Sequence, residues 1–281
     1  MKRLIEILTI IWKTKDIREK ILYTLLCIAA YRLLSFIVLP GIDPERLSEH
    51  MRNLGGIASL LNAFAGGAFA RASITALGVM PYISASIIMQ LMSVAFPAIQ
   101  RLQKEGEYGR RKINEWTRYL TVAVCLVQAP GYLQSQIPTE ALTLHSKALF
   151  LLNTILLTVG SLVSMWLGEK ITDRGIGNGI SILITVGIIV DFPTALAFEF
   201  ETMKDKGGMV LFVAEILLWL AILMFIILVV QGVRKIPIQF TRRVVSGGEI
   251  VGGARQFLPI KVNAAGVMPI VFAQAIMFLP Y

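Results

Sequence analysis

The chain has 281 residues, of which 56% are hydrophobic and 16% are charged, and its net charge is +9. About a quarter of the residues of an ordinary soluble domain are charged, so this composition excludes a soluble globular protein and indicates a membrane protein. The two cysteines, Cys27 and Cys125, both lie in apolar segments, and the two histidines have no ligand cluster around them. The sequence therefore predicts no structural disulfide, no metal site and no cofactor.

The first 20 residues combine a short apolar run with six basic residues and contain no small-residue cleavage site. They do not form a cleavable signal, and we expect an amphipathic helix on the cytoplasmic membrane surface. Seven apolar segments follow, and each has about the 20 residues needed to cross ~30 Å of hydrocarbon. They are residues 21–39, 76–95, 117–136, 148–168, 179–198, 209–230 and 262–281.

The distribution of basic residues predicts the orientation of these spans. With the N-terminus in the cytoplasm, the inner segments are residues 1–20, 96–118, 169–178 and 231–261, and they carry 20 Lys and Arg. The outer segments, residues 40–75, 137–147 and 199–208, carry 6. Because basic residues concentrate on the cytoplasmic side of membrane proteins, the net charge is mainly a topology signal. It does not by itself indicate nucleic-acid binding.

Residues 54–70 are apolar and rich in glycine, but too interrupted to span. Irregular backbone at membrane depth occurs where it lines a cavity or is buried in protein. We interpret the segment as a re-entrant half-helix that dips into a pore; an outer-surface loop is the simpler alternative. The second span, which follows it, carries Ser84, Ser86 and Gln90, polar groups that are costly in hydrocarbon unless they face protein or water.

Two further motifs have local interpretations. GIGNGIS (175–181) is not a dinucleotide-binding loop, because no strand precedes it and an apolar span follows. Its small residues favour close helix packing, and Asn178 either caps the fifth span or bonds to a neighbouring helix. RRVVSGGEIVGG (242–253) contains two short β-prone runs around Ser246-Gly247-Gly248, which predicts a hairpin.

Five blocks together resemble the SecY family, the channel subunits of the Sec protein translocon. They are ALGVMPYISASIIMQL (76–91), KEGEYGRRKINEWTRY (104–119), MWLGEKITDRGIGNGISI (165–182), RKIPIQFTRRVV (234–245) and LPIKVNAAGVMPIVFA (258–273), and they cover about a quarter of the chain in the family's order. The resemblance implies an all-α membrane protein, a polytopic bundle with ten helices in two inverted halves around an hourglass pore. A re-entrant helix plugs this pore, and a lateral gate opens to lipid.

On this reading the chain has three parts. Residues 1–20 are the cytoplasmic N-terminal helix, and residues 21–198 are the first five-helix half with the plug segment 54–70. Residues 199–281 are a partial second half with the sixth span, the basic cytoplasmic loop 231–261 and the seventh span. We expect a truncated SecY chain that lacks the last three helices of the family.

The resemblance also assigns roles to residues. The aliphatic pore ring falls on Val79, Ile83, Ile180, Ile184 and Val271; the first and second pairs are each four residues apart and share a helix face. The plug falls on Ile57, Leu60, Leu61, Asn62, Phe64 and Phe69, and the lateral gate on Ser84, Ile87, Gln90 and Gln274. Docking of the ribosome, through rRNA phosphates, and of the SecA motor falls on Arg110, Arg111, Lys112, Arg234, Lys235, Arg242 and Arg243. Many relatives have a basic pair at the tip of the second loop, where this chain has Gly247-Gly248.

The function implied is that of a protein-conducting channel in the cytoplasmic (inner) membrane. It moves signal-bearing polypeptides across the membrane and releases hydrophobic segments laterally into lipid, with SecE-like and SecG-like partners. No catalytic constellation or nucleotide-binding motif occurs, so we expect a channel and not an enzyme. The alternatives are a broken-helix secondary transporter, which would couple ions through Arg32, Asp191 or Glu215, and a membrane scaffold without transport.

Overall fold

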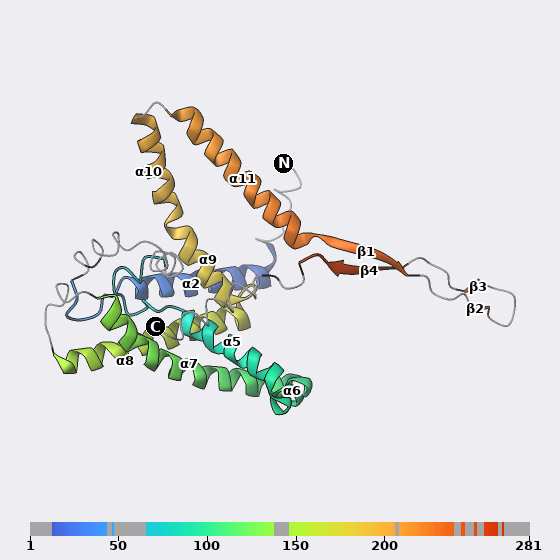
Figure 1. The fold of residues 1–281 in the computed structure, drawn as a ribbon, viewed down its shortest axis with the longest axis horizontal. Coiled ribbons are helices and arrows are strands. Elements are labelled where there is room, and N and C mark those ends of the chain that lie inside the picture. The colour runs from blue at the N-terminus through green and yellow to red at the C-terminus, as the bar shows by residue number, and fades with distance from the viewer. Residues whose placement is uncertain are drawn as a thin grey trace. The chain divides into compact units, whose positions relative to one another are not determined.

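The computed structural model describes residues 13–43, 47, 66–137, 146–205, 208–238, 243–244, 250–251, 256–263 and 266. Helices dominate these residues (Figure 1). The chain divides into two compact units, one ending at Ala195 and the other beginning at Leu196.

Among the described residues, the first unit contains five long or medium helices and one short helix. They are α2 (Lys15–Ser35), α5 (Met80–Ala95), α6 (Pro97–Lys104), α7 (Glu107–Ser135), α8 (Lys147–Arg174) and α9 (Gly179–Val190). α7 packs against α5 on one side and α8 on the other, and α8 also contacts α2 and α9 (Figure 1). α8 is therefore the helix around which the others assemble.

Several buried hydroxyl groups of α7 and α8 find their acceptors within their own helices. Thr117 and Thr121 on α7, and Thr158 and Ser164 on α8, each donate to the carbonyl oxygen four residues earlier in their own helix. Because each of these hydroxyls is satisfied within its own helix, it can be buried in the bundle without an unpaired polar group.

Two apolar clusters form the core of this unit. One joins the turns before α5 to the C-terminal half of α7 and to α8, with Phe69, Ala129, Tyr132 and Leu157 among its buried members. The other joins α2, the start of α5, α8 and α9. The second cluster is the one that holds most of the predicted pore ring.

The predicted spans agree with the structure to different degrees. The fourth and sixth lie in α8 and in α11 (Met209–Gln231), and both helices are long and apolar enough to cross a membrane. The fifth, predicted at 179–198, is confirmed as a candidate span but continues to Lys204 through α9 and α10 (Phe192–Asp205). Residues 199–205 are therefore helical, so the helix extends into the segment 199–208 that the sequence analysis assigned to the outer side. The helix is interrupted at Asp191, two residues before Pro193, which lacks the N–H that a continuous helix would need.

The first, second and third predicted spans form α2, α5 and α7. α5 and α6 together would make a further candidate span with a bend of 101°. α2 and α7 begin in charged turns and α2 also contains Arg32, so length and composition alone do not identify them as spans. The seventh predicted span, 262–281, lies outside the described residues except for 262, 263 and 266.

The basic inner segment 96–118 is mostly helical. α6 and the first turns of α7 occupy it, separated only by Glu105 and Gly106. Gly106 has φ +76°, a conformation that side chains rarely adopt, and this allows the sharp turn between the two helices. The basic residues of this segment are thus displayed on helices and not on an irregular loop.

The second unit contains most of α10, α11 and two short antiparallel ladders. β1 (Val233–Ile238) pairs with β4 (Gln256–Lys261), and β2 (Arg243–Val244) pairs with β3 (Ile250–Val251). The hairpin predicted around Ser246-Gly247-Gly248 is confirmed by the β2–β3 pairing, although its tip lies outside the described residues. The β1–β4 ladder was not predicted, because Pro237 and Pro259 interrupt the strand pattern.

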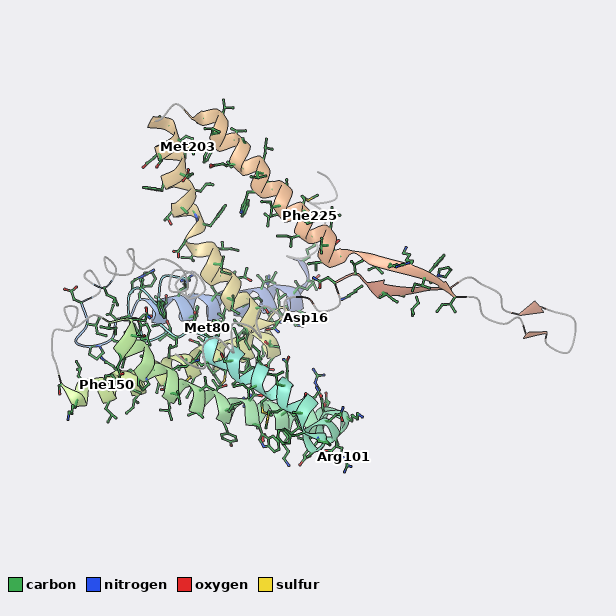
Figure 2. All side chains as sticks on the ribbon, viewed as in Figure 1. Asp16, Met80, Arg101, Phe150, Met203 and Phe225 are labelled. Atoms are coloured by element: carbon green, nitrogen blue, oxygen red, sulfur yellow. The ribbon has the colours of Figure 1, made fainter. Side chains whose placement is uncertain are left out.

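α11 carries apolar side chains on every side (Figure 2, around Phe225). None of its side chains is buried by the other described residues. A helix that is apolar all round suits a lipid environment or a helical partner.

Candidate functional site

Four of the five predicted pore-ring residues meet in one apolar cluster. Val79, at the entrance to α5, is buried with 5% exposure, and Ile83 lies one turn further along α5. Ile180 and Ile184, both half-buried, come from α9 and pack against the same cluster. The fifth residue, Val271, lies outside the described residues. Two helices that are distant in sequence therefore bring aliphatic side chains together.

Hydrogen bonds from a capping side chain fix the first turn of α9, which positions Ile180 and Ile184. The Asn178 side-chain oxygen accepts hydrogen bonds from the backbone N–H groups of Ile180 and Ser181, at 3.1 and 3.3 Å. Asn178 is therefore an N-cap, and that one of its two predicted roles is confirmed. Without the cap, the first N–H groups of α9 would lack partners.

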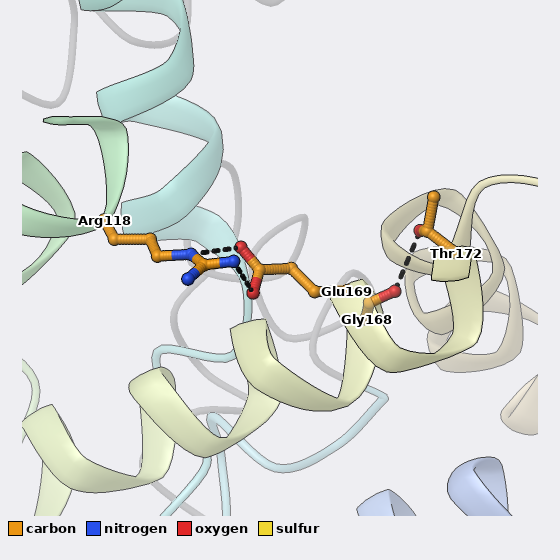
Figure 3. Close-up of polar contacts among 4 residues, drawn as sticks. All are labelled: Arg118, Gly168, Glu169 and Thr172. Carbon is orange, nitrogen blue, oxygen red and sulfur yellow. Dashed lines mark hydrogen bonds and ion pairs between the residues drawn. The ribbon is translucent and has the colours of Figure 1, made fainter. Parts of the chain in front are cut away.

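A hydrogen-bond relay adds a second attachment between α8 and α9. The Thr172 hydroxyl donates to the Gly168 carbonyl at 2.9 Å (Figure 3) and accepts from the Gly179 N–H at 2.8 Å. A Cβ on Gly179 would overlap the Gly168 carbonyl oxygen, so the two backbones are in direct contact. The expectation that small residues of GIGNGIS permit close helix packing is confirmed.

Only the end of the predicted plug segment falls within the described residues. Phe69 is buried at 5% exposure, and its ring packs edge-on against Tyr132, with the centroids 4.8 Å apart. The Tyr132 hydroxyl also donates to the Phe69 carbonyl oxygen at 2.7 Å. The other predicted plug residues, Ile57, Leu60, Leu61, Asn62 and Phe64, lie outside the described residues.

The predicted lateral-gate residues do not share one environment. On α5, Ser84 is half-buried, Ile87 is buried at 4% exposure and Gln90 is exposed. Gln274 lies outside the described residues. The assignment of a gate to these residues stays a prediction.

The predicted docking cations that the structure describes occur on three elements, α7, β1 and β2. Arg110 and Arg111 are exposed on the first turns of α7 and Lys112 is half-buried. Arg234 and Lys235 are exposed on β1, and Arg243 belongs to β2. Arg242 lies outside the described residues.

One cation of the same segment has a specific partner that the sequence analysis missed. Arg118 of α7 forms a two-pronged ion pair with Glu169 of α8 (Figure 3), with both N–O distances at 2.9 Å. Bidentate arginine–carboxylate pairs are the stronger kind of ion pair and fix geometry as well as charge. The sequence offered one indication of this pair. Arg118 lies in the N-terminal half of α7 and Glu169 near the C-terminal end of α8, and these parts come together when two consecutive helices pack antiparallel.

Arg32 is, after Arg118, the second charged residue whose partners were not predicted from the sequence. It lies in the last turn of α2, where its Nη1 donates to the Gly66 carbonyl at 3.2 Å and its Nη2 to the Val186 carbonyl at 2.9 Å. Asp191 and Glu215, the carboxylates that an ion-coupled transporter would use, are both exposed. Among the described residues no group of three or more His, Cys, Asp or Glu side chains could hold a metal ion.

The chain matches a known protein family. The SecY family model matches residues 73–281. The protein translocase subunit SecY of Aquifex aeolicus is 42% identical, over 98% of this chain and 66% of that protein. The subunits of the same name from Streptomyces scabiei and Pseudomonas aeruginosa are 39% and 42% identical, over 96% and 94% of this chain. The chain spans 64% and 60% of those two proteins, so it covers less than two thirds of these relatives.

Solved structures show the same fold. "The structure of a protein conducting channel" superimposes with a TM-score of 0.64 at 18% identity, over 95% of this chain and 58% of that chain. Sec61 in the canine ribosome-channel complex from the endoplasmic reticulum gives a TM-score of 0.62 at 18% identity, with the same coverage. The arrangement of helices is thus similar to that of these channels.

Proposed function

This chain belongs to the SecY family, and we propose on that basis that it forms part of a protein-conducting channel. The channel moves signal-bearing polypeptides across the cytoplasmic membrane and releases hydrophobic segments laterally into lipid. The energy comes from a partner, either a translating ribosome or a SecA-type motor. The proposed orientation places the N-terminus in the cytoplasm, as the distribution of basic residues favours.

The meeting of Val79, Ile83, Ile180 and Ile184 in one aliphatic cluster is the observation that carries this proposal. Bulky aliphatic side chains around a narrow opening exclude water and ions, so they seal a pore without binding any particular sequence. They also adapt their rotamers to a passing chain, whereas a ring of charged groups would select particular side chains. We assign the seal of the channel to this cluster together with Val271.

The remaining roles complete the proposal. The segment 54–70 is the plug, Ser84, Ile87, Gln90 and Gln274 contribute to the lateral gate, and SecE-like and SecG-like subunits are partners. The exposed cations Arg110 and Arg111 on α7 and Arg234 and Lys235 on β1 support docking of rRNA phosphates or of a motor protein. Arginine and lysine side chains on exposed elements supply the charge that phosphate contacts require.

Translocation in cells depleted of their own SecY tests the proposal directly. Two versions are compared: the 281-residue chain, and the same chain followed by the part of the Aquifex aeolicus relative that it does not cover. We expect a signal-bearing precursor to be exported when the longer version is supplied. Failure of both versions, with both present in the membrane at normal levels, would contradict the proposed function.

The seal can be tested separately in vesicles that contain the longer version. We expect Ile184→Ser to raise the ion conductance of the resting channel, because a hydroxyl in the collar lowers the barrier to wetting. Ile189→Ser is the matched control, since Ile189 lies on the same helix with 56% exposure. Equal leak from both variants, or leak from neither, would show that Ile184 does not contribute to a seal.

A further inference from the structure

Arg32 is an arginine in an apolar helix whose bonding partners are main-chain carbonyls. Its two bonds reach Gly66, 34 residues away, and Val186, 154 residues away. Arginine at membrane depth is costly, and where it occurs it faces the interior of the bundle and pairs with other charges or with backbone carbonyls. An arginine in such a position is therefore a candidate functional residue, because a helix that only anchors the chain in the membrane does not need one.

The two carbonyls belong to segments that carry or lead to residues of the pore-ring cluster. This is the second apolar cluster, which joins α2, the start of α5, α8 and α9. Val186 belongs to α9, one turn before the interruption at Asp191, and Gly66 lies in the turns that lead to Val79 and α5. Because Arg32 bonds to the backbone of α9, it holds the helix itself and not merely a side chain. Arg32 therefore links three segments through one guanidinium group.

The backbone around this group is packed so closely that side chains are excluded. Gly66 has φ +59°, and a Cβ there would lie 2.7 Å from both Nη1 and Nη2 of Arg32 and 3.0 Å from the Gly187 Cα. Gly187 is itself buried in α9. A side chain at Gly66 would therefore collide with the guanidinium group and with the backbone of α9 at Gly187.

We propose that Arg32 is a positioning residue for the seal: it ties α2 and the Gly66 turn to α9, and so sets the position of Ile180 and Ile184 opposite Val79 and Ile83. The link to the seal rests on the proposed function, but the tie itself does not. α2 supplies Cys27 and Tyr31 to the same cluster, and α9 supplies Leu183. Loss of the tie lets α9 separate from α2 and opens the cluster locally.

Neighbouring Arg71 provides a matched control. Its Nε donates to the Gly67 carbonyl at 3.2 Å, a residue of its own turn, and its guanidinium lies 4.8 Å from the centre of the Phe36 ring. Arg71→Gln removes a nearby positive charge while leaving both Arg32 bonds in place. Arg32→Gln removes the charge and the fork that bridges the two carbonyls.

The two native cysteines report on local and global opening. Cys27 is buried at 4% exposure inside the pore-ring cluster, and Cys125 is fully buried in the other part of the first unit. A buried thiol reacts only when the structure around it opens, so its rate of alkylation measures the population of the open state. The whole chain, solubilised in detergent, is treated with N-ethylmaleimide and the rate at each cysteine is measured by mass spectrometry.

We expect Arg32→Gln to raise the rate at Cys27 by roughly tenfold or more, since hydrogen bonds to a charged donor are lost, and to leave the rate at Cys125 within about twofold. Gly66→Ala should raise the rate at Cys27 as well, because its Cβ displaces the guanidinium. Arg32→Lys should lie between wild type and Arg32→Gln, and Arg71→Gln should match wild type. If the Arg32→Gln protein does not accumulate, the alkylation rates at Cys27 in Arg32→Lys and Gly66→Ala provide the test.

Three results would overturn the proposal: an unchanged rate at Cys27, equal increases at both cysteines, or the same increase in Arg71→Gln as in Arg32→Gln. The second would mean general destabilisation and the third an effect of local charge. Because alkylation does not depend on transport, a failed translocation assay with a selective increase at Cys27 would contradict the channel function and leave the tie intact.

Discussion

Replacement of Gly179 by alanine tests the close contact of α8 and α9 that positions the predicted ring. The new Cβ would overlap the Gly168 carbonyl oxygen and lie 2.6 Å from the Ile171 Cβ. Carbon atoms rest at about 3.5–4.0 Å from each other, so α9 must move by about 1 Å from α8. Forced overpacking of this kind typically costs about 1–3 kcal/mol.

Gly168→Ala is the matched substitution across the same interface. Its Cβ would meet one side-chain atom, Ile180 Cγ1, at 2.9 Å, and would lie at an ordinary contact distance of 3.5 Å from the Ile180 backbone, so the overlap is much smaller than the one at Gly179. The replacement also gains about 1 kcal/mol of helix propensity in the interior of α8. We therefore expect Gly168→Ala to change stability little, although both glycines lie at the contact between α8 and α9.

Thermal unfolding of both variants in detergent, followed by tryptophan fluorescence, measures the difference. We expect a clearly lower melting temperature for Gly179→Ala and a value near wild type for Gly168→Ala. A Gly179→Ala chain as stable as wild type, or a Gly168→Ala chain that is the less stable of the two, would refute the reasoning from backbone contact.

Three other substitutions test individual contacts by the same unfolding assay. Asn178→Ala should cost about 1 kcal/mol because it removes the α9 cap, and Asn178→Asp should retain most of that stability, since aspartate caps equally well. Glu169→Gln should lower the free energy of unfolding by at most about 1 kcal/mol, since the Arg118 side chain is 51% exposed. The difference from wild type should shrink in 1 M salt. A larger loss of stability that does not depend on salt would contradict a partly exposed ion pair. Tyr132→Phe should cost about 1 kcal/mol, because the buried Phe69 carbonyl loses its shorter hydrogen bond and keeps only the one from the Ala72 N–H at 3.3 Å; no loss would argue against the tyrosine bond.

Local and periodic features of this protein could be predicted from the sequence. The apolar runs of α8 and α11 identified helices of membrane length, because hydrocarbon thickness sets the number of residues needed. The sequence indicated Asn178 as a possible helix cap and residues 242–253 as a hairpin, since each feature depends on residues within a few positions of each other. The five motif blocks identified the family, which the comparisons confirm.

The tertiary structure alone decided which distant residues meet. The partners of Arg32 lie 34 and 154 residues away, and no periodicity in the sequence indicates that its guanidinium would reach two carbonyls. Arg118 looked like one basic residue among several, yet helix packing places it against Glu169. Likewise, the spacing of Val79 with Ile83 and of Ile180 with Ile184 indicated two helix faces, but only the packing of α5, α8 and α9 brings those faces into one cluster. The physical reason is that sequence patterns determine local conformation and the environment that each face prefers, whereas the partner of a face depends on how the assembled helices fill space.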